Sequence, residues 1–269
     1  DHAEAITGVL YPNDDTEKGK RLRLKQQYFF SSASLQDLVK EYQARHGSDF
    51  SKFPEEYAIQ LNDTHPVVSI PELIRILVAR EGVPFAQALE IARKTFAYTN
   101  HTIMAEALEK WDVKLFRSVL PDVYRYVLMI HKALLRELGR AGIKGEAQKP
   151  FLIIDEKRIH MARLAIFATH STNGVARIHS EILKQRELNN WYRLYPERFN
   201  NKTNGITQRR WLALCNPELS GFITDKIGSG WLTDLAELKK LEQWKDDGAA
   251  LKEFARIKSE KKRQLSEYI

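Results

Sequence analysis

The chain has 269 residues, of which 43% are hydrophobic and 29% are charged, as is ordinary for a folded globular protein. This length allows one large domain or two smaller ones, each with its own core. The formal net charge of +7 would suit a polyanionic partner or a phosphorylated substrate. However, no run of five or more like charges occurs, so we expect a solvated surface and no nucleic-acid partner.

The sequence contains a single cysteine, Cys215, so it has no intrachain disulfide framework and favours a reducing, cytoplasmic setting. The apolar run Trp211–Leu214 just before it predicts that Cys215 is a small buried residue. We expect no membrane association, because no apolar stretch is long enough for a span and no signal-peptide pattern is present. The first residue is not methionine and the last helical pattern has no stop, so we expect an internal piece of a longer protein.

The first segment, residues 9–15, is a short apolar piece that is broken by Pro12 and followed by polar residues. This pattern predicts either a plain loop or a mobile acidic loop that gates a site. From about Arg23 to Arg45 the apolar spacing predicts a helix that ends at Gly47, with a break at Ser31–Ser34.

Two strand patterns end in polar side chains. Glu56–Asn62 runs into Asp63 and His65, and Phe96–Thr99 runs into His101. Two predicted helices, Glu72–Arg80 and Pro84–Lys94, lie between these strands. Strand, helix and strand in this order predict a parallel sheet with crossover helices. The carboxyl ends of parallel strands meet at one edge, so we expect Asp63, His65 and His101 to face one crevice.

A third strand is predicted at Ile166–Thr169, ending at His170 and followed by a helix from Val175 to about Arg186. Three histidines at strand ends suggest a site, although Asn100 and Thr102 could simply cap the next helix. The other predicted elements are one more strand and several helices. The strand is Phe151–Ile154, and the helices are Ala105–Lys110, Pro121–Arg140, Arg158–Leu164, Pro217–Ile227, Leu232–Trp244 and Ala249–Tyr268.

A polar turn containing Gly205 precedes a predicted helix that begins with Arg209 and Arg210. Two arginines at a helix amino terminus oppose the macrodipole, so a phosphate or carboxylate nearby would offset them. Alternatively, they are ordinary surface arginines.

Five motifs in order carry a family resemblance that covers essentially the whole chain. They are LYPND (Leu10–Asp14), QLNDTHP (Gln60–Pro66), YTNHT…EALE (Tyr98–Glu109), NGVARIHSEILK (Asn173–Lys184) and NKTNGIT-RRW (Asn201–Trp211). With these motifs the chain resembles the α-glucan phosphorylases. The resemblance implies an α/β fold with a Rossmann-like parallel sheet and many helices, within a two-domain glycosyltransferase architecture of the GT-B type. Residues 1–205 would be the later part of the first domain, and residues 206–269 the helical start of the second, cofactor-binding domain.

The resemblance also implies an activity, a cofactor and partners. The family cleaves α-1,4-glucans with inorganic phosphate, releases glucose 1-phosphate with retained configuration, and uses the phosphate group of pyridoxal phosphate. The full-length enzyme would be a homodimer. No metal is expected.

Roles in the site follow from the motifs. His101 would be the catalytic residue, contacting the 6-hydroxyl of the reacting sugar, with its main-chain carbonyl near the anomeric centre. Asn204 would bind the same sugar, and Asp14 and Asp15 would form a gating loop. Five residues would line the pocket beside the anomeric carbon: Asp63, His65, Thr102, Ala107 and Glu109. Three would lie near the cofactor: Trp211, Arg209 and Arg210.

Three departures from the family pattern matter. Gln208 replaces the usual proline of the last motif. Lys40-Glu41 stand where animal enzymes carry arginines for AMP, so we expect no AMP activation. The lysine that forms the Schiff base would lie beyond Ile269, so this chain alone should be inactive. Two other functions remain open: a non-catalytic module that binds carbohydrate or polyanions, and a metal hydrolase using Asp63 and the histidines, whose spacing fits no ligand motif.

Overall fold

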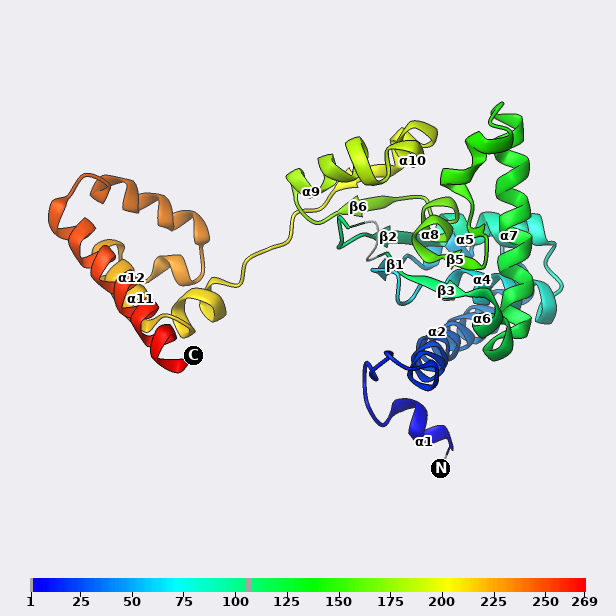
Figure 1. The fold of residues 1–269 in the computed structure, drawn as a ribbon, viewed down its shortest axis with the longest axis horizontal. Helices are drawn as coiled ribbons and strands as arrows, with labels where there is room; N and C mark the ends of the chain where they lie inside the picture. Colours follow the sequence, from blue (N-terminus) through cyan, green and yellow to red (C-terminus); the bar gives the residue numbers. More distant parts are fainter. Residues whose placement is uncertain (1, 105–107) are drawn as a thin grey trace. The chain divides into compact units, whose positions relative to one another are not determined.

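The computed structural model describes residues 2–104 and 108–269 and divides into two compact units, Asp1–Thr203 and Asn204–Ile269 (Figure 1). The helix at residues 2–7 is the first element, and Figure 1 follows the chain from there in colour. No helix in the described residues is long and apolar enough to cross a membrane.

The first unit is built around a four-stranded parallel sheet with the strand order β1-β2-β6-β7. Its strands are β1 (Ile59–Asn62), β2 (Phe96–Thr99), β6 (Thr172–Gly174) and β7 (Phe199–Asn201). In the register, Ile59 pairs with Phe96, Tyr98 with Thr172, and Thr172 with Phe199. The predicted parallel sheet is therefore confirmed, and β2 has the predicted bounds. The first strand is shorter than predicted, because Phe53–Glu56 forms a helical turn (α3) before it.

The third strand prediction is wrong. Ile166 lies in a helix, α8 (Met161–Phe167), and β6 begins only at Thr172, so His170 precedes a strand. The backbone N–H of His170 donates to Phe96 O at 3.1 Å, which places His170 at the amino end of β2. His170 thus lies at the opposite edge of the sheet from His65 and His101. A short, fully buried apolar run does not distinguish a strand from a helix by its periodicity, which explains the error.

A second, antiparallel sheet was not predicted as such. It has the order β3-β5-β4, and its strands are β3 (Lys110–Asp112), β4 (Ile154–Asp155) and β5 (Arg158–His160). Of the predicted helix Ala105–Lys110, residues 105–107 lie outside the described residues and Lys110 begins β3. In the predicted strand Phe151–Ile154, Phe151 instead ends a 3-10 helix, Gly145–Phe151. Strands of two or three residues are too short to show an alternating pattern.

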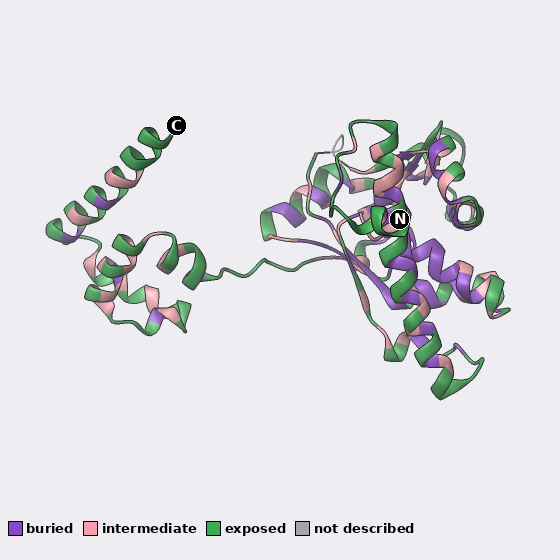
Figure 2. Ribbon diagram, turned by 90° about the horizontal axis from the view of Figure 1, so that it is seen from below, coloured by how far each residue is buried: buried purple, intermediate pink, exposed green. Residues whose placement is uncertain are grey.

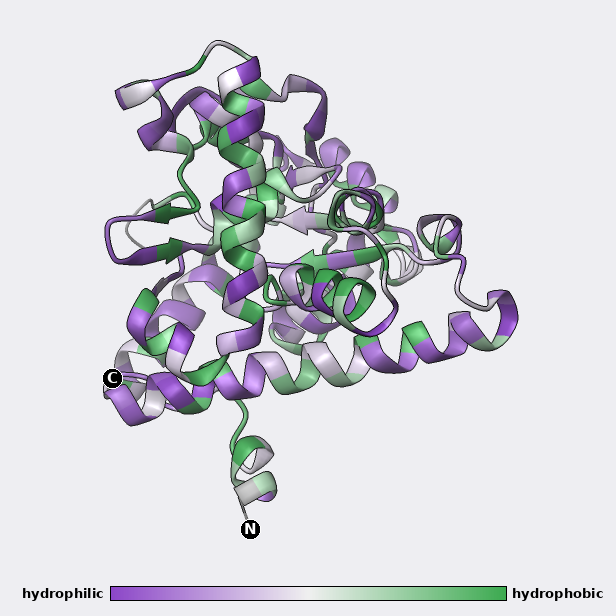
Figure 3. Cartoon of the chain, turned by 90° about the vertical axis from the view of Figure 1, so that its right-hand side faces the viewer, coloured by the Kyte–Doolittle hydropathy of each residue, from purple (hydrophilic) through white to green (hydrophobic). Residues whose placement is uncertain are grey.

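The helices of the first unit mostly follow the predicted patterns. In chain order they are α1 (His2–Thr7), α2 (Glu17–His46), α4 (Ser69–Arg75) with a π-helix at Ile76–Arg80, α5 (Phe85–Thr95), α6 (Val113–Val119), α7 (Pro121–Arg140), α8, α9 (Arg177–Ile182) with a π-helix at Leu183–Glu187, α10 (Asn189–Leu194) and a 3-10 turn at Pro196–Arg198. The α7 prediction is confirmed at both ends, and Figure 3 shows hydrophobic and hydrophilic residues alternating along the long helices.

Helix α2 runs without a break through Ser31–Ser34, contrary to the prediction. Ser32 is buried, and its hydroxyl donates to Glu72 Oε1 at 2.6 Å. Ser32 therefore hydrogen-bonds a buried carboxylate on α4 and does not interrupt the helix. As predicted, α2 ends at Gly47, which has a φ of 63° that a residue without a side chain adopts most readily.

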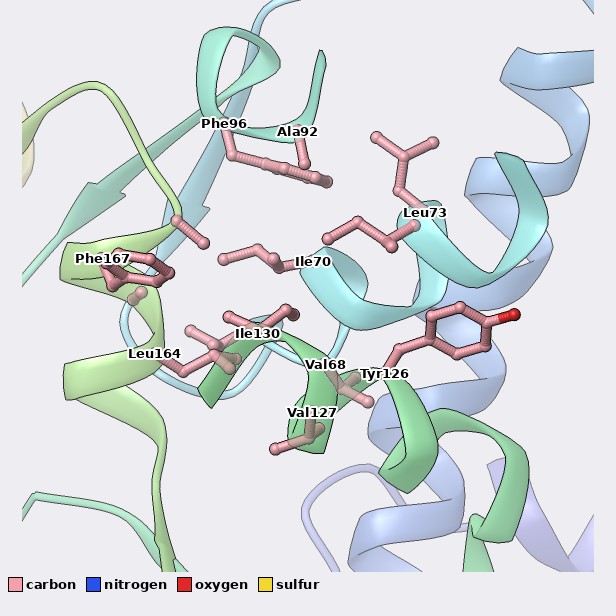
Figure 4. Close-up of a cluster of buried hydrophobic side chains, with 14 of the residues drawn as sticks. Val68, Ile70, Leu73, Ala92, Phe96, Tyr126, Val127, Ile130, Leu164 and Phe167 are labelled. Carbon is pink, nitrogen blue, oxygen red and sulfur yellow. The ribbon is translucent and has the colours of Figure 1, made fainter. Parts of the chain in front are cut away.

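The core of the first unit lies between the sheet and helices α4, α5, α7 and α8. Figure 4 shows Ile70, Phe96, Ile130 and Phe167 directed toward one another, and all four are fully buried. This packing fixes the strands of the parallel sheet, whose carboxyl ends carry the predicted site.

The second unit is wholly helical in the structure. Its elements are a π-helix (Arg209–Leu214), α11 (Pro217–Ile227), two 3-10 helices (Gly230–Leu232 and Leu235–Trp244) and α12 (Gly248–Tyr268). Figure 2 shows few buried residues there. Gln208 is one of them, and its amide donates to Leu232 O at 3.1 Å.

The prediction of a buried Cys215 is wrong, because this residue is exposed. Leu214, in the apolar run before it, is 73% exposed. The run predicted burial, but its Leu212 and Ala213 are only half-buried in this unit.

Candidate functional site

A cleft of about 870 Å³ lies at the carboxyl edge of the parallel sheet. It is bounded by the turn after β1, the segment after β2, the antiparallel sheet and the loop before α2. Five predicted site residues line it: Asp14, Asp63, His65, Thr102 and Glu109. The structure thus brings together side chains that are up to 95 positions apart in the sequence, from residue 14 to residue 109.

Glu109 is a largely enclosed acidic group of the cleft, with a side chain that is 13% exposed. Gln27 Nε2 donates to its Oε2 at 3.1 Å, and Trp111 Nε1 donates to its Oε1 at 3.2 Å. His65 Nδ1 lies 3.3 Å from the same Oε2. The hydrogen bond with Glu109 raises the pKa of His65, against the opposing effects of burial and of Arg23.

Arg23 is a cleft residue that the sequence analysis missed. Its Nη1 lies 3.0 Å from Asp14 Oδ2 and its Nη2 lies 3.3 Å from His65 Nδ1. The ring of Tyr11 meets His65 edge-on at 5.8 Å between centroids. The helical spacing placed Arg23 on α2, but nothing in that pattern showed which face it would turn to the cleft.

His101 is exposed and is not among the residues that line the cleft. Its Nε2 contacts Asn62 Oδ1, at the end of β1. The preceding residue, Asn100, is buried, donates to the Tyr98 hydroxyl at 3.0 Å and accepts from the Thr102 N–H at 3.1 Å. Asn100 therefore closes a local turn, and no helix starts within residues 101–104.

The remaining predicted residues fall elsewhere. Asp15 is exposed outside the cleft, and its N–H donates to Asn13 Oδ1 at 2.8 Å. Ala107 lies outside the described residues. Four predicted site residues belong to the second unit: Asn204, Arg209, Arg210 and Trp211.

In the second unit, Trp211 is 69% exposed and Arg210 is exposed beside it in the sequence. Arg209 Nη1 donates to Leu232 O at 2.9 Å, so part of its guanidinium serves the fold of this unit. An exposed indole next to an exposed guanidinium offers a flat apolar surface and an anion-binding group. These residue types fit a phosphorylated aromatic cofactor.

The antiparallel sheet supplies the far wall of the cleft, which sequence reasoning missed together with the sheet. Asp155, Glu156, Arg158 and His160 lie there. Burial, with Arg163 and Lys110 adding to it, lowers the pKa of His160 to about 4. His160 is thus a neutral hydrogen-bonding group at neutral pH.

The described residues hold no cluster of three or more histidine, cysteine or acidic side chains that could bind a metal. His170, which the metal-hydrolase alternative required, lies at the other edge of the sheet. Nothing in the described geometry favours that alternative.

Comparisons with known proteins agree with the motifs. Residues 1–269 match the sequence profile of the family described as Carbohydrate phosphorylase. The brain form of glycogen phosphorylase from Mus musculus is 48% identical over 98% of this chain. The brain and liver forms from Homo sapiens are 47% and 45% identical, each over 99% of it. The chain spans about a third of the length of these curated relatives, 33% in each case. By its sequence along its whole length, the chain belongs to the carbohydrate phosphorylase family.

Proposed function

We propose that the chain is part of an α-1,4-glucan phosphorylase, which cleaves glycogen, starch or maltodextrin with inorganic phosphate and releases glucose 1-phosphate with retained configuration. The observation that carries this proposal is the cleft at the carboxyl edge of the sheet, where Asp14, Asp63, His65, Thr102 and Glu109 converge. Ligands of open α/β sheets bind at this edge. Family membership supplies the reaction class, since the relatives named above are glycogen phosphorylases.

In this proposal His101 binds the 6-hydroxyl of the reacting glucosyl unit, and its main-chain carbonyl faces the anomeric carbon. A fixed carbonyl dipole there favours the positive charge that develops in an oxocarbenium-like transition state. Asp63, His65, Thr102 and Glu109 form the wall beside the anomeric carbon; Ala107, which the motif adds to this set, lies outside the described residues.

Asp14 and Asp15 lie in the loop that borders the cleft, in keeping with a gating role. Asn204 would bind the reacting sugar. The division into units at residues 203 and 204 supports a boundary between two domains of a GT-B architecture near residue 205.

Pyridoxal phosphate, when bound, supplies acid–base chemistry through its phosphate group. Trp211 and Arg210 are the residues of this chain that would hold it, with Arg209 beside them. We place the Schiff-base lysine outside residues 1–269, so the chain alone is inactive. The full-length protein would be a homodimer without AMP activation.

The test is phosphorolysis by a full-length protein that carries this segment. With glycogen and inorganic phosphate it should release glucose 1-phosphate as the α-anomer, and release should depend on phosphate. His101→Ala should reduce the rate by roughly 10²-fold or more, because it removes a group that contacts the reacting sugar.

His170→Ala is the matched control, since His170 lies at the opposite edge of the sheet. Its rate should stay close to that of the unsubstituted protein. A folded protein that binds saccharide or polyanions without releasing glucose 1-phosphate would overturn the proposal in favour of a binding module.

A further inference from the structure

Arg23 bridges two parts of the cleft that come from distant segments. One guanidinium nitrogen pairs with Asp14 in the loop before α2, and the other faces His65 in the turn after β1. The neighbouring Leu24 is fully buried, so the packing of α2 fixes where the Arg23 side chain leaves the helix. The Arg23 side chain itself is 22% exposed.

The contact with Arg23 bears on the protonation of His65. A guanidinium only donates hydrogen bonds, so His65 Nδ1 must carry no proton when it accepts from Arg23 Nη2 at 3.3 Å. The same Nδ1 lies 3.3 Å from Glu109 Oε2, and an ionised carboxylate only accepts. Nδ1 can therefore serve Arg23 or Glu109, but not both at once.

We propose that Arg23 is a positioning residue of the cleft: it ties the loop carrying Asp14 to the ring of His65 and competes with Glu109 for Nδ1, in favour of the neutral ring whose Nδ1 accepts. In this state the Glu109 carboxylate keeps its own acceptor capacity for a hydroxyl group of the ligand. When His65 gains a proton, its Nδ1–H turns to Glu109 and its charge repels Arg23. The link between the loop and the turn after β1 is then lost.

Three charged groups act on the His65 ring, from three segments of the chain. Glu109 precedes β3, Asp63 follows β1 and Arg23 lies on α2, with the first two favouring the charged ring and the third opposing it. The inference rests on the proposed function only for the nature of the ligand, a glucan hydroxyl.

The first test is a pH titration of the 269-residue chain labelled with ¹⁵N-histidine, with His65 assigned through His65→Gln. Arg23→Met keeps the side-chain length and removes the donors and the charge. It should raise the pKa of His65 and move Nδ1 toward its protonated chemical shift at neutral pH, because the charge that opposes the protonated ring is removed.

Arg21→Met is the matched control on the same helix. Arg21 bonds to Glu17 and to the Ser118 hydroxyl, away from His65, so the pKa of His65 should not change. An unchanged or lowered pKa of His65 in Arg23→Met would overturn the proposal.

The second test is hydrogen exchange of residues 8–15. Arg23→Met and Asp14→Asn should each speed exchange of this loop several-fold, whereas Arg21→Met should not. If Arg23→Met does not fold, Arg23→Lys replaces it, because an ammonium group lacks the two separate nitrogens with which the guanidinium reaches Asp14 and His65. No change in either the pKa or the exchange rate of that variant would also overturn the proposal. Neither measurement needs turnover, so a protein without phosphorylase activity would still give a clear answer.

Discussion

A Cβ atom added to Gly174 would lie 2.5 Å from Ser180 Oγ and 3.0 Å from the Ser180 backbone nitrogen. Gly174 ends β6 and Ser180 lies on α9, so the two elements pack so closely here that only a residue without a side chain fits. Gly174→Ala should therefore lower the free energy of unfolding by about 1–3 kcal/mol, because β6 or α9 must shift.

Chemical denaturation would measure this change. Gly139→Ala, on α7, is the same substitution at a site with no atom within 4 Å of the added Cβ. There the change should be neutral or stabilising by up to about 1 kcal/mol, since alanine favours a helix over glycine. Equal losses in both variants would contradict the argument.

Glu72 is completely buried and receives two hydrogen bonds from Arg75, at 2.7 and 2.9 Å. Glu72→Gln should lower the free energy of unfolding by about 3 kcal/mol, because the Arg75 charge loses its partner in a buried site. Urea denaturation at pH 7 measures the loss.

The exposed pair Glu41 and Arg45, one helical turn apart on α2, provides the comparison. Glu41→Gln should cost at most about 1 kcal/mol, as is usual for surface pairs. A loss at Glu72 no larger than that at Glu41 would show that Arg75 finds another partner.

His160 should make stability depend on pH in the acidic range. Its pKa is lowered to about 4 in the folded chain, mainly by burial, whereas an unfolded histidine titrates near 6.5. The unfolded state thus binds the proton first, and stability falls as the pH drops from about 6.5 to about 4.

His160→Asn should therefore lose less stability than the unsubstituted chain between pH 7 and pH 5. Denaturation curves of both proteins at the two pH values isolate this contribution. The same loss in both would mean that His160 is not the group responsible.

Glu109→Gln should lower the pKa of His65. The hydrogen bond with Glu109 is the main cause of the raised pKa, and without it burial and Arg23 oppose the charged ring. Histidine NMR detects the change, and Glu156→Gln, with the same loss of charge elsewhere in the cleft, should leave His65 unaffected. A raised pKa in Glu109→Gln would be incompatible with the assigned contact.

Long, repeated patterns were predictable from the sequence, and short or context-dependent ones were not. The 20 residues of α7 show their apolar stripe several times over, so both of its ends were predicted. By contrast, β4 has two residues, and its partner β5 was taken for the start of a helix. Strands of this kind depend on their neighbours rather than on their own pattern.

The candidate site divides in the same way. Parallel pairing predicted that Asp63, His65 and His101 would face one crevice, and Asp63 and His65 do line the cleft, but His101 does not. Arg23 reaches the cleft because of the way α2 packs. His160 reaches it because β5 joins the antiparallel sheet, which the sequence pattern does not predict. His170 was misplaced because a buried helix was mistaken for a strand.

The two units differ greatly in how much apolar surface they remove from water, and this difference bears on folding cooperativity. The second unit buries only four apolar side chains: Ile223, Trp231, Ala250 and Ile257. So small a core offsets little of the chain entropy lost on folding, whereas the first unit has an extensive one. The chain should therefore melt in two transitions. In the intermediate the sheet and its cleft persist while residues 204–269 are already unfolded, so residues 1–203 can be studied with their fold intact.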